Sequence, residues 1–146
     1  MSAAKNILLV EDDEHDQIFF VRAIRKIENV VLQDVAFNGL EALEKLETLN
    51  PLPDLVFMDI DMPLMDGVKC LEEITKKPNL KSIVVVMLSN STDNAELTRT
   101  LGAKAFIRKP SDPSTLHTKL REIIHLDFSV ANDIADQSFA TAFARL

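Results

Sequence analysis

The stretch DLVFMDIDMPLMDG, residues 54–67, begins with a short apolar run and then places an aspartate, Asp59, at its carboxyl end. An apolar run of this length between turn residues predicts a strand that is buried on both faces, as in parallel sheets. Pro63 and Gly67 predict a turn after the strand, and Asp66 is placed to cap the helix that follows. The apolar strand does not explain why a carboxylate stands at its end.

The rest of the chain repeats this pattern of a strand followed by a helix, which is typical of parallel strands joined by helical crossovers. The expected strands are residues 6–10, 31–37, 54–58, 82–88 and 105–108. The second alternates polar and apolar residues, as edge strands do, and the fourth is the most apolar, which predicts a central position. Gly102 is expected to end the fourth helix, and Asp112-Pro113 to begin the last. We predict an α/β fold with a five-stranded, parallel, doubly wound sheet and helices on both faces.

Length and composition limit the partners of this protein. Its 146 residues are enough for one domain with a substantial core. A net charge of −7 and the absence of Tyr and Trp argue against binding to nucleic acid or to an anionic membrane surface. Cys70 is the single cysteine, and no signal peptide or long apolar span is visible, so we expect a cytoplasmic protein that has no internal disulfide.

Polar side chains stand at the carboxyl ends of several predicted strands, where doubly wound sheets place their ligands. They are Glu11, Asp12 and Asp13 after the first strand, Asp59 after the third, Ser89 and Asn90 after the fourth, and Lys109 after the fifth. Each of them alone has a plain structural explanation, such as Asp12 or Asp13 capping the first helix. Their joint occurrence at one edge of the sheet favours a functional site.

The chemistry of this set indicates a metal ion and phosphoryl transfer. Crowded carboxylates repel one another, so a proton or a cation must relieve the repulsion. Oxygen ligands without His or Cys favour a hard ion, and a few carboxylates with water suit Mg²⁺. An Asp carboxylate can attack phosphorus and form an acyl phosphate if cations neutralise the phosphoryl oxygens. With Mg²⁺, Lys109 and the hydroxyl of Ser89 nearby, Asp59 is the candidate nucleophile.

These motifs resemble those of the receiver domains of two-component response regulators. The resemblance covers about residues 5–125, from ILLVEDDEHD through DLVFMDIDMPLMDG and VVVMLSNS to GAKAFIRKP and the last helix. It implies a flavodoxin-like sheet with the strand order 2-1-3-4-5. It also implies a signalling switch in place of an enzyme: the protein accepts a phosphoryl group from a histidine kinase or a phosphotransfer protein, promotes its own phosphorylation and dephosphorylation, and then binds a downstream protein.

The resemblance also implies a role for each matching residue. Asp59 would be the phosphoacceptor, and Glu11, Asp12, Asp59 and the backbone carbonyl of Asp61 would hold Mg²⁺. Ser89 and Lys109 would contact the phosphoryl group. Ser89 and Phe106 would form the switch, in which Ser89 moves toward the phosphoryl group and Phe106 turns inward. The bond between Lys109 and Pro110 would be a cis peptide that aims the lysine into the site.

The end of the chain is expected to form an extension to the receiver domain. We assign residues 1–125 to the receiver and residues 126–146 to an extension that is too short for an output domain, so contacts of the receiver would carry the output. Ala135, Phe139, Phe143 and Leu146 recur in the extension with helical spacing. This stripe could dock on its own domain, pair with a second protomer in a homodimer, or become ordered only with a partner, and the sequence leaves these alternatives open.

Other functions fit the residues less well. DIDMP contains the DxD motif of phosphohydrolases of the haloacid dehalogenase type, but those enzymes place DxD near the chain start and favour Thr or Val where Pro63 stands. A receiver-like binding module that acts without phosphorylation is the other alternative. Among receivers, the free-standing type resembles motility regulators, phosphorelay shuttles and partners of sensor kinases such as phytochromes, and KKPNLKSIVVVMLSNS is most similar to the last group.

Overall fold

The computed structural model describes residues 4–126 and Phe128. Strands and helices alternate along the chain in the order β1 (Lys5–Val10), α1 (Glu14–Ile24), β2 (Val30–Ala36), α2 (Gly39–Thr48), β3 (Leu55–Asp59), α3 (Gly67–Lys76), β4 (Val84–Ser89), α4 (Ala95–Thr100), β5 (Ala105–Arg108) and α5 (Pro113–Ile124). The strands are parallel and lie in the order β2-β1-β3-β4-β5. The predicted flavodoxin-like α/β fold is therefore confirmed. In the part of the chain that the structure describes, no helix is long and apolar enough to cross a membrane.

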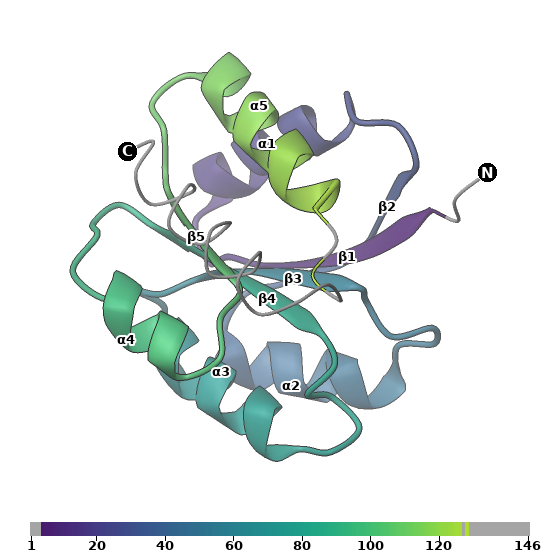
Figure 1. The fold of residues 1–146 in the computed structure, drawn as a ribbon, viewed down its shortest axis with the longest axis vertical. Helices are drawn as coiled ribbons and strands as arrows, with labels where there is room; N and C mark the ends of the chain where they lie inside the picture. Colours follow the sequence, from purple (N-terminus) through teal and green to yellow (C-terminus); the bar gives the residue numbers. More distant parts are fainter. Residues whose placement is uncertain (1–3, 127, 129–146) are drawn as a thin grey trace.

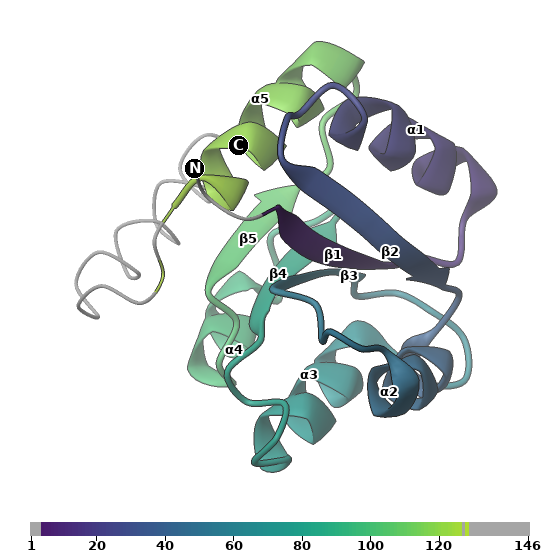
Figure 2. The same cartoon turned by 90° about the vertical axis from the view of Figure 1, so that its right-hand side faces the viewer.

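The helices form a layer on each face of the sheet, with α1 and α5 on one face and α2, α3 and α4 on the other (Figures 1 and 2). Phe20 of α1 packs on Phe57 of β3 in the first layer, where the ring centroids are 5.2 Å apart. Leu71 and Ile74 of α3 belong to the second layer. β2 is at an edge, as predicted, but β3 holds the centre and β4 lies beside it. Both β3 and β4 are interior strands that helices cover on both faces, and such strands are apolar. The degree of apolarity therefore did not distinguish the central strand from its neighbour.

Aspartates begin three of the helices, which explains where the helices start. Asp13, Asp66 and Asp112 each accept a hydrogen bond from the backbone N–H of the residue three positions further on, at 2.9 to 3.0 Å. The predicted caps at Asp66 and Asp112 are confirmed, and Gly102 ends α4 with a positive φ of 113°. At the first helix, where two aspartates were candidates, Asp13 is the cap. Asp12 does not cap the helix, so its carboxylate is available for a site at the carboxyl ends of the strands.

Gly67 allows α3 to start directly against the end of β3. Its N–H donates to the carbonyl oxygen of Ile60 at 2.8 Å. A Cβ at this position would collide with the carbonyl oxygen of Asp59 and would lie 2.9 Å from the Cα of Ile60. Only glycine fits so close to another backbone. In the loop between β3 and α3, by contrast, Leu64 has a positive φ of 68° and is 81% exposed.

Cys70 is a core residue, and we expect its thiol to be unreactive in the folded protein. It is fully buried on α3, and burial raises the pKa of its thiol to about 12. At pH 8, a thiol with this pKa is ionised in about one molecule in ten thousand, and the thiolate is the reactive form. Ellman's reagent should therefore release no colour from the native protein and one equivalent from the unfolded protein. Rapid labelling of the native protein would contradict the burial of Cys70.

Candidate functional site

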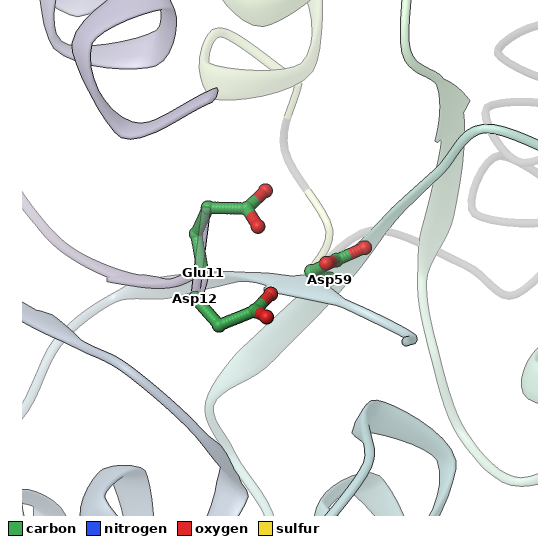
Figure 3. A group of neighbouring side chains, drawn as sticks. All are labelled: Glu11, Asp12 and Asp59. Carbon is green, nitrogen blue, oxygen red and sulfur yellow. The ribbon is translucent and has the colours of Figure 1, made fainter. Parts of the chain in front are cut away.

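Three carboxylates come together at the carboxyl ends of β1 and β3 (Figure 3). Glu11 and Asp12 directly follow β1, Asp59 is the last residue of β3, and one oxygen atom of each lies within 4.8 Å of the others. The two strands are hydrogen-bonded neighbours, with Val10 opposite Met58, so the chain delivers these residues to one place. Glu11 is 1% exposed and Asp59 is 6% exposed, whereas Asp12 faces solvent. The sequence predicted this grouping.

Lys109, immediately after β5, brings an ammonium group to these carboxylates. Its Nζ lies 2.8 Å from Oε1 of Glu11 and 3.3 Å from Oδ1 of Asp59. The backbone N–H of Lys109 donates to the carbonyl oxygen of Ser89 at 2.7 Å, which fixes the start of the loop. Lys109 thus connects the ends of β1, β3 and β5.

Asp16 is a partner of Lys109 that sequence reasoning missed. Its Oδ2 lies 2.8 Å from Nζ of Lys109, as close as the oxygen of Glu11. The one signal in the sequence is its position three residues after the cap Asp13, in the first turn of α1. An acidic residue in the first turn already has an explanation, since it interacts favourably with the helix dipole. Nothing local therefore pointed to a partner 93 residues away.

Burial controls the electrostatics of the site. It raises the pKa of Glu11 to about 8, and the charge of Asp59 adds to this, while the hydrogen bond from Lys109 opposes it. Burial also raises the pKa of Asp59. Burial alone would lower the pKa of Lys109, but its hydrogen bonds to Asp16 and Glu11 and the charge of Asp59 outweigh that effect and raise it. The raised pKa values of Glu11 and Asp59 indicate that one ammonium group does not fully compensate the burial of these carboxylates.

The donor set of the site fits a small hard cation. Glu11, Asp12 and Asp59 offer only carboxylate oxygens, and within residues 4–126 and 128 they are the one group of this size, drawn from His, Cys, Asp and Glu, that could share an ion. Hard oxygen donors with one exposed ligand suit Mg²⁺, which keeps several water molecules when it binds to proteins. The side chain of Asp61 is exposed and lies outside this group. That its backbone carbonyl is a ligand stays a prediction.

The two predicted switch residues occupy neighbouring strands. Ser89 ends β4, is 3% exposed, and accepts a hydrogen bond on its Oγ from the N–H of Ser91 at 3.2 Å. Phe106 of β5 is fully buried in the layer that holds α2, α3 and α4. Its neighbours Ala105 and Ile107 point into the opposite layer. The alternation of β5 thus directs Phe106 into this layer, and its turn in the switch stays a prediction.

The prediction of a cis peptide bond between Lys109 and Pro110 was wrong. Among the described residues, the cis bond is at Asn50–Pro51. Lys109 reaches Glu11, Asp16 and Asp59 without a cis bond, because β5 itself ends beside β4 and its following residue already faces the carboxylates.

Comparison with known proteins agrees with this geometry. The family model described as the response regulator receiver domain matches residues 7–121. The chain is 37% identical over 120 residues to the chemotaxis protein CheY of Thermotoga maritima. The matched region covers 82% of this chain and 97% of that protein. The crystal structure of the phosphorylated cyanobacterial phytochrome response regulator RcpA matches with a TM-score of 0.74 and 31% identity, over 89% of this chain and 98% of that one. The crystal structure of the CheX–CheY complex of Borrelia burgdorferi with BeF₃ and Mg²⁺ matches with a TM-score of 0.74 and 28% identity, over 85% of this chain and 92% of that one.

Proposed function

Because the chain belongs to the response regulator receiver domain family, we propose that it is a phosphorylation-dependent switch that accepts a phosphoryl group on Asp59. Regulators of this kind are phosphoacceptors and not classical enzymes, and receiver domains pair with histidine kinases. The donor would be the phosphohistidine of a sensor kinase or of a phosphotransfer protein in the cytoplasm. The observation that carries the proposal is the place of Asp59, buried at the end of the central strand with Lys109 3.3 Å from its carboxylate.

In the proposed reaction, a carboxylate oxygen of Asp59 attacks the phosphorus atom of the phosphohistidine. A P–O bond forms, the P–N bond breaks, and the imidazole leaves with the electron pair of that bond. Lys109 would move its ammonium group from the carboxylates to a phosphoryl oxygen, and the hydroxyl of Ser89 would donate to another. The rigid strand β3 would hold the nucleophile in line, and positioning is the largest part of what this reaction requires.

Glu11, Asp12, Asp59 and the backbone carbonyl of Asp61 are the residues that would hold Mg²⁺. When bound, the ion would supply positive charge to the phosphoryl oxygens and to the crowded carboxylates. The oxygen-only donor set supports this assignment. So does the similarity to the Borrelia burgdorferi CheY, whose crystal structure contains BeF₃ and Mg²⁺.

The output would pass through the face that α4, β5 and α5 form. A phosphoryl group on Asp59 would draw the hydroxyl of Ser89 toward it and would change the packing of the β4–α4 loop above Phe106. A downstream protein would then bind the altered face. In this proposal residues 1–125 are the receiver domain, and residues 126–146 extend it.

Mass spectrometry of the intact protein after incubation with acetyl phosphate and Mg²⁺ tests the function. We expect one phosphoryl adduct on the wild type, no adduct on Asp59→Asn, and none in the presence of EDTA. Asp61→Asn is the matched control and should keep the adduct, since only its backbone is proposed to act. If quenched early time points show no adduct while a known receiver is labelled, the protein is a binding module that acts without phosphorylation.

A further inference from the structure

A cavity of about 550 Å³ lies at the edge of the sheet opposite to the carboxylates. The first residues of β1, β3 and β4 line it, together with Lys104, which precedes β5. The carboxylates stand at the carboxyl ends of these parallel strands, so the cavity is a separate feature at their amino ends. Its size leaves room for a few side chains.

The cavity combines an apolar floor with a positively charged rim. Of its lining residues, the buried Ile83 and the half-buried Leu52 are taken as the floor, and the half-buried Lys5 and the exposed Lys81 and Lys104 as the rim. Among the residues that the structure describes, none of these ammonium groups takes part in an ion pair. The acid in the lining, Asp54, already accepts a hydrogen bond from the N–H of Asn6 at 2.7 Å. The cavity therefore suits a segment that carries both apolar side chains and carboxylates.

Phe128 connects this cavity to the end of the chain. Its side chain lines the cavity and also packs against the core layer under α1 and α5. The structure describes no residue beyond Phe128, so the remaining residues, 129–146, continue the chain from the cavity itself. They include Phe139, Phe143 and Leu146 at helical spacing, with Asp133 and Asp136 before them and one basic residue, Arg145, near the end.

We propose that residues 129–146 dock in this cavity of their own molecule. The stripe of Phe139, Phe143 and Leu146 would meet the apolar floor, and Asp133 and Asp136 would meet the lysines of the rim. The segment is long enough, since 18 residues with helical rise would span about 27 Å. Attachment at Phe128 also gives the segment an effective concentration on the order of millimolar at the cavity, which favours it over a second copy of the chain.

Paramagnetic broadening of amide signals tests this docking directly. The variant Ser138→Cys would carry a nitroxide on its new thiol, and the buried Cys70 would not react with the label. We expect the label to broaden the amide signals of Ser82, Ile83 and Val84 in the full-length protein without metal or phosphodonor. Signals that are broadened elsewhere in the fold, or nowhere, would overturn the proposal.

Three further samples identify the occupant and the forces that hold it. In a mixture of ¹⁵N-labelled wild type with unlabelled, nitroxide-bearing protein, we expect no broadening; broadening there would make the occupant a second copy and overturn the proposal. The double variant Lys81→Glu/Lys104→Glu should lose the broadening, and the control Lys26→Glu, at an exposed lysine after α1, should keep it. Broadening that survives the double variant would contradict the role of the rim. None of these results bears on whether Asp59 accepts a phosphoryl group.

Discussion

Replacement of Lys109 by methionine should lower the free energy of unfolding by about 3 kcal/mol at pH 8 without metal, as is typical when one partner of a buried ion pair is removed. The side chain of Lys109 is 14% exposed and contacts the carboxylates of Glu11 and Asp59, whose side chains are 1% and 8% exposed. Methionine fills a similar volume, but it leaves these buried carboxylates without their cation. Chemical denaturation in the presence of EDTA measures the loss.

Three comparisons separate this electrostatic cause from a general effect of the substitution. Lys26→Met, at an exposed site, should change the free energy of unfolding by less than about 0.5 kcal/mol. Asp16→Asn should cost less than Lys109→Met, because Asp16 is 40% exposed and solvent screens its charge. Lowering the pH from 8 to 6 should shrink the penalty of Lys109→Met. In the wild type, the pKa of Glu11 is raised to about 8, although Lys109 lowers it. Without Lys109 this pKa is higher still, so the folded variant binds more protons than the wild type over this range and gains more stability as the pH falls. A Lys109→Met variant as stable as the wild type at pH 8 would contradict the account.

Gly67→Ala should destabilise the protein by about 2 kcal/mol, within the usual range for overpacking a closely packed site, and should also prevent phosphorylation of Asp59. The added methyl group would collide with the carbonyl oxygen of Asp59 and approach the Cα of Ile60 to 2.9 Å. Both obstacles are backbone atoms, which cannot rotate away as a side chain can. Relief therefore requires a shift of α3 or of the end of β3, and either shift moves the proposed nucleophile.

Gly39→Ala is the matched control for this prediction. Its added methyl group would lie 2.7 Å from Cγ of Met65, an atom at which a flexible side chain can give way, and 2.8 Å from the carbonyl oxygen of the same residue. We expect Gly39→Ala to be the milder change in denaturant unfolding and to keep the phosphoryl adduct in mass spectrometry. The reverse order of the two variants would show that the β3–α3 contact is less rigid than the structure indicates.

The fold could be predicted from the sequence because its signals are local. Apolar runs identified the strands, and the caps Asp66 and Asp112 marked the starts of two helices before any contact between distant residues was known. The grouping of Glu11, Asp12 and Asp59 followed from topology, since the carboxyl ends of neighbouring parallel strands must meet. The sequence therefore predicts which residues meet at the ends of neighbouring strands, even when these residues lie far apart in the chain.

Features that depend on how side chains turn in three dimensions could not be predicted. The contact between Lys109 and Asp16 depends on how α1 lies over the strand ends, which no local pattern encodes. The pleat of β5 decides which layer Phe106 enters, whereas the turn of its side chain on switching stays a prediction. The Lys109–Pro110 bond was assigned from resemblance alone, and the geometry of the β5 end makes a cis bond unnecessary.

The burial of all the residues of β3 gives Asp59 and its following loop very different susceptibility to local opening. Amide hydrogens of a central, fully buried strand exchange with solvent only through global unfolding, whereas an exposed loop around Leu64 exchanges through small fluctuations. A few residues therefore separate a slowly exchanging strand from a rapidly exchanging loop. The loop can therefore change its shape while the carboxylate of Asp59 stays where the sheet holds it.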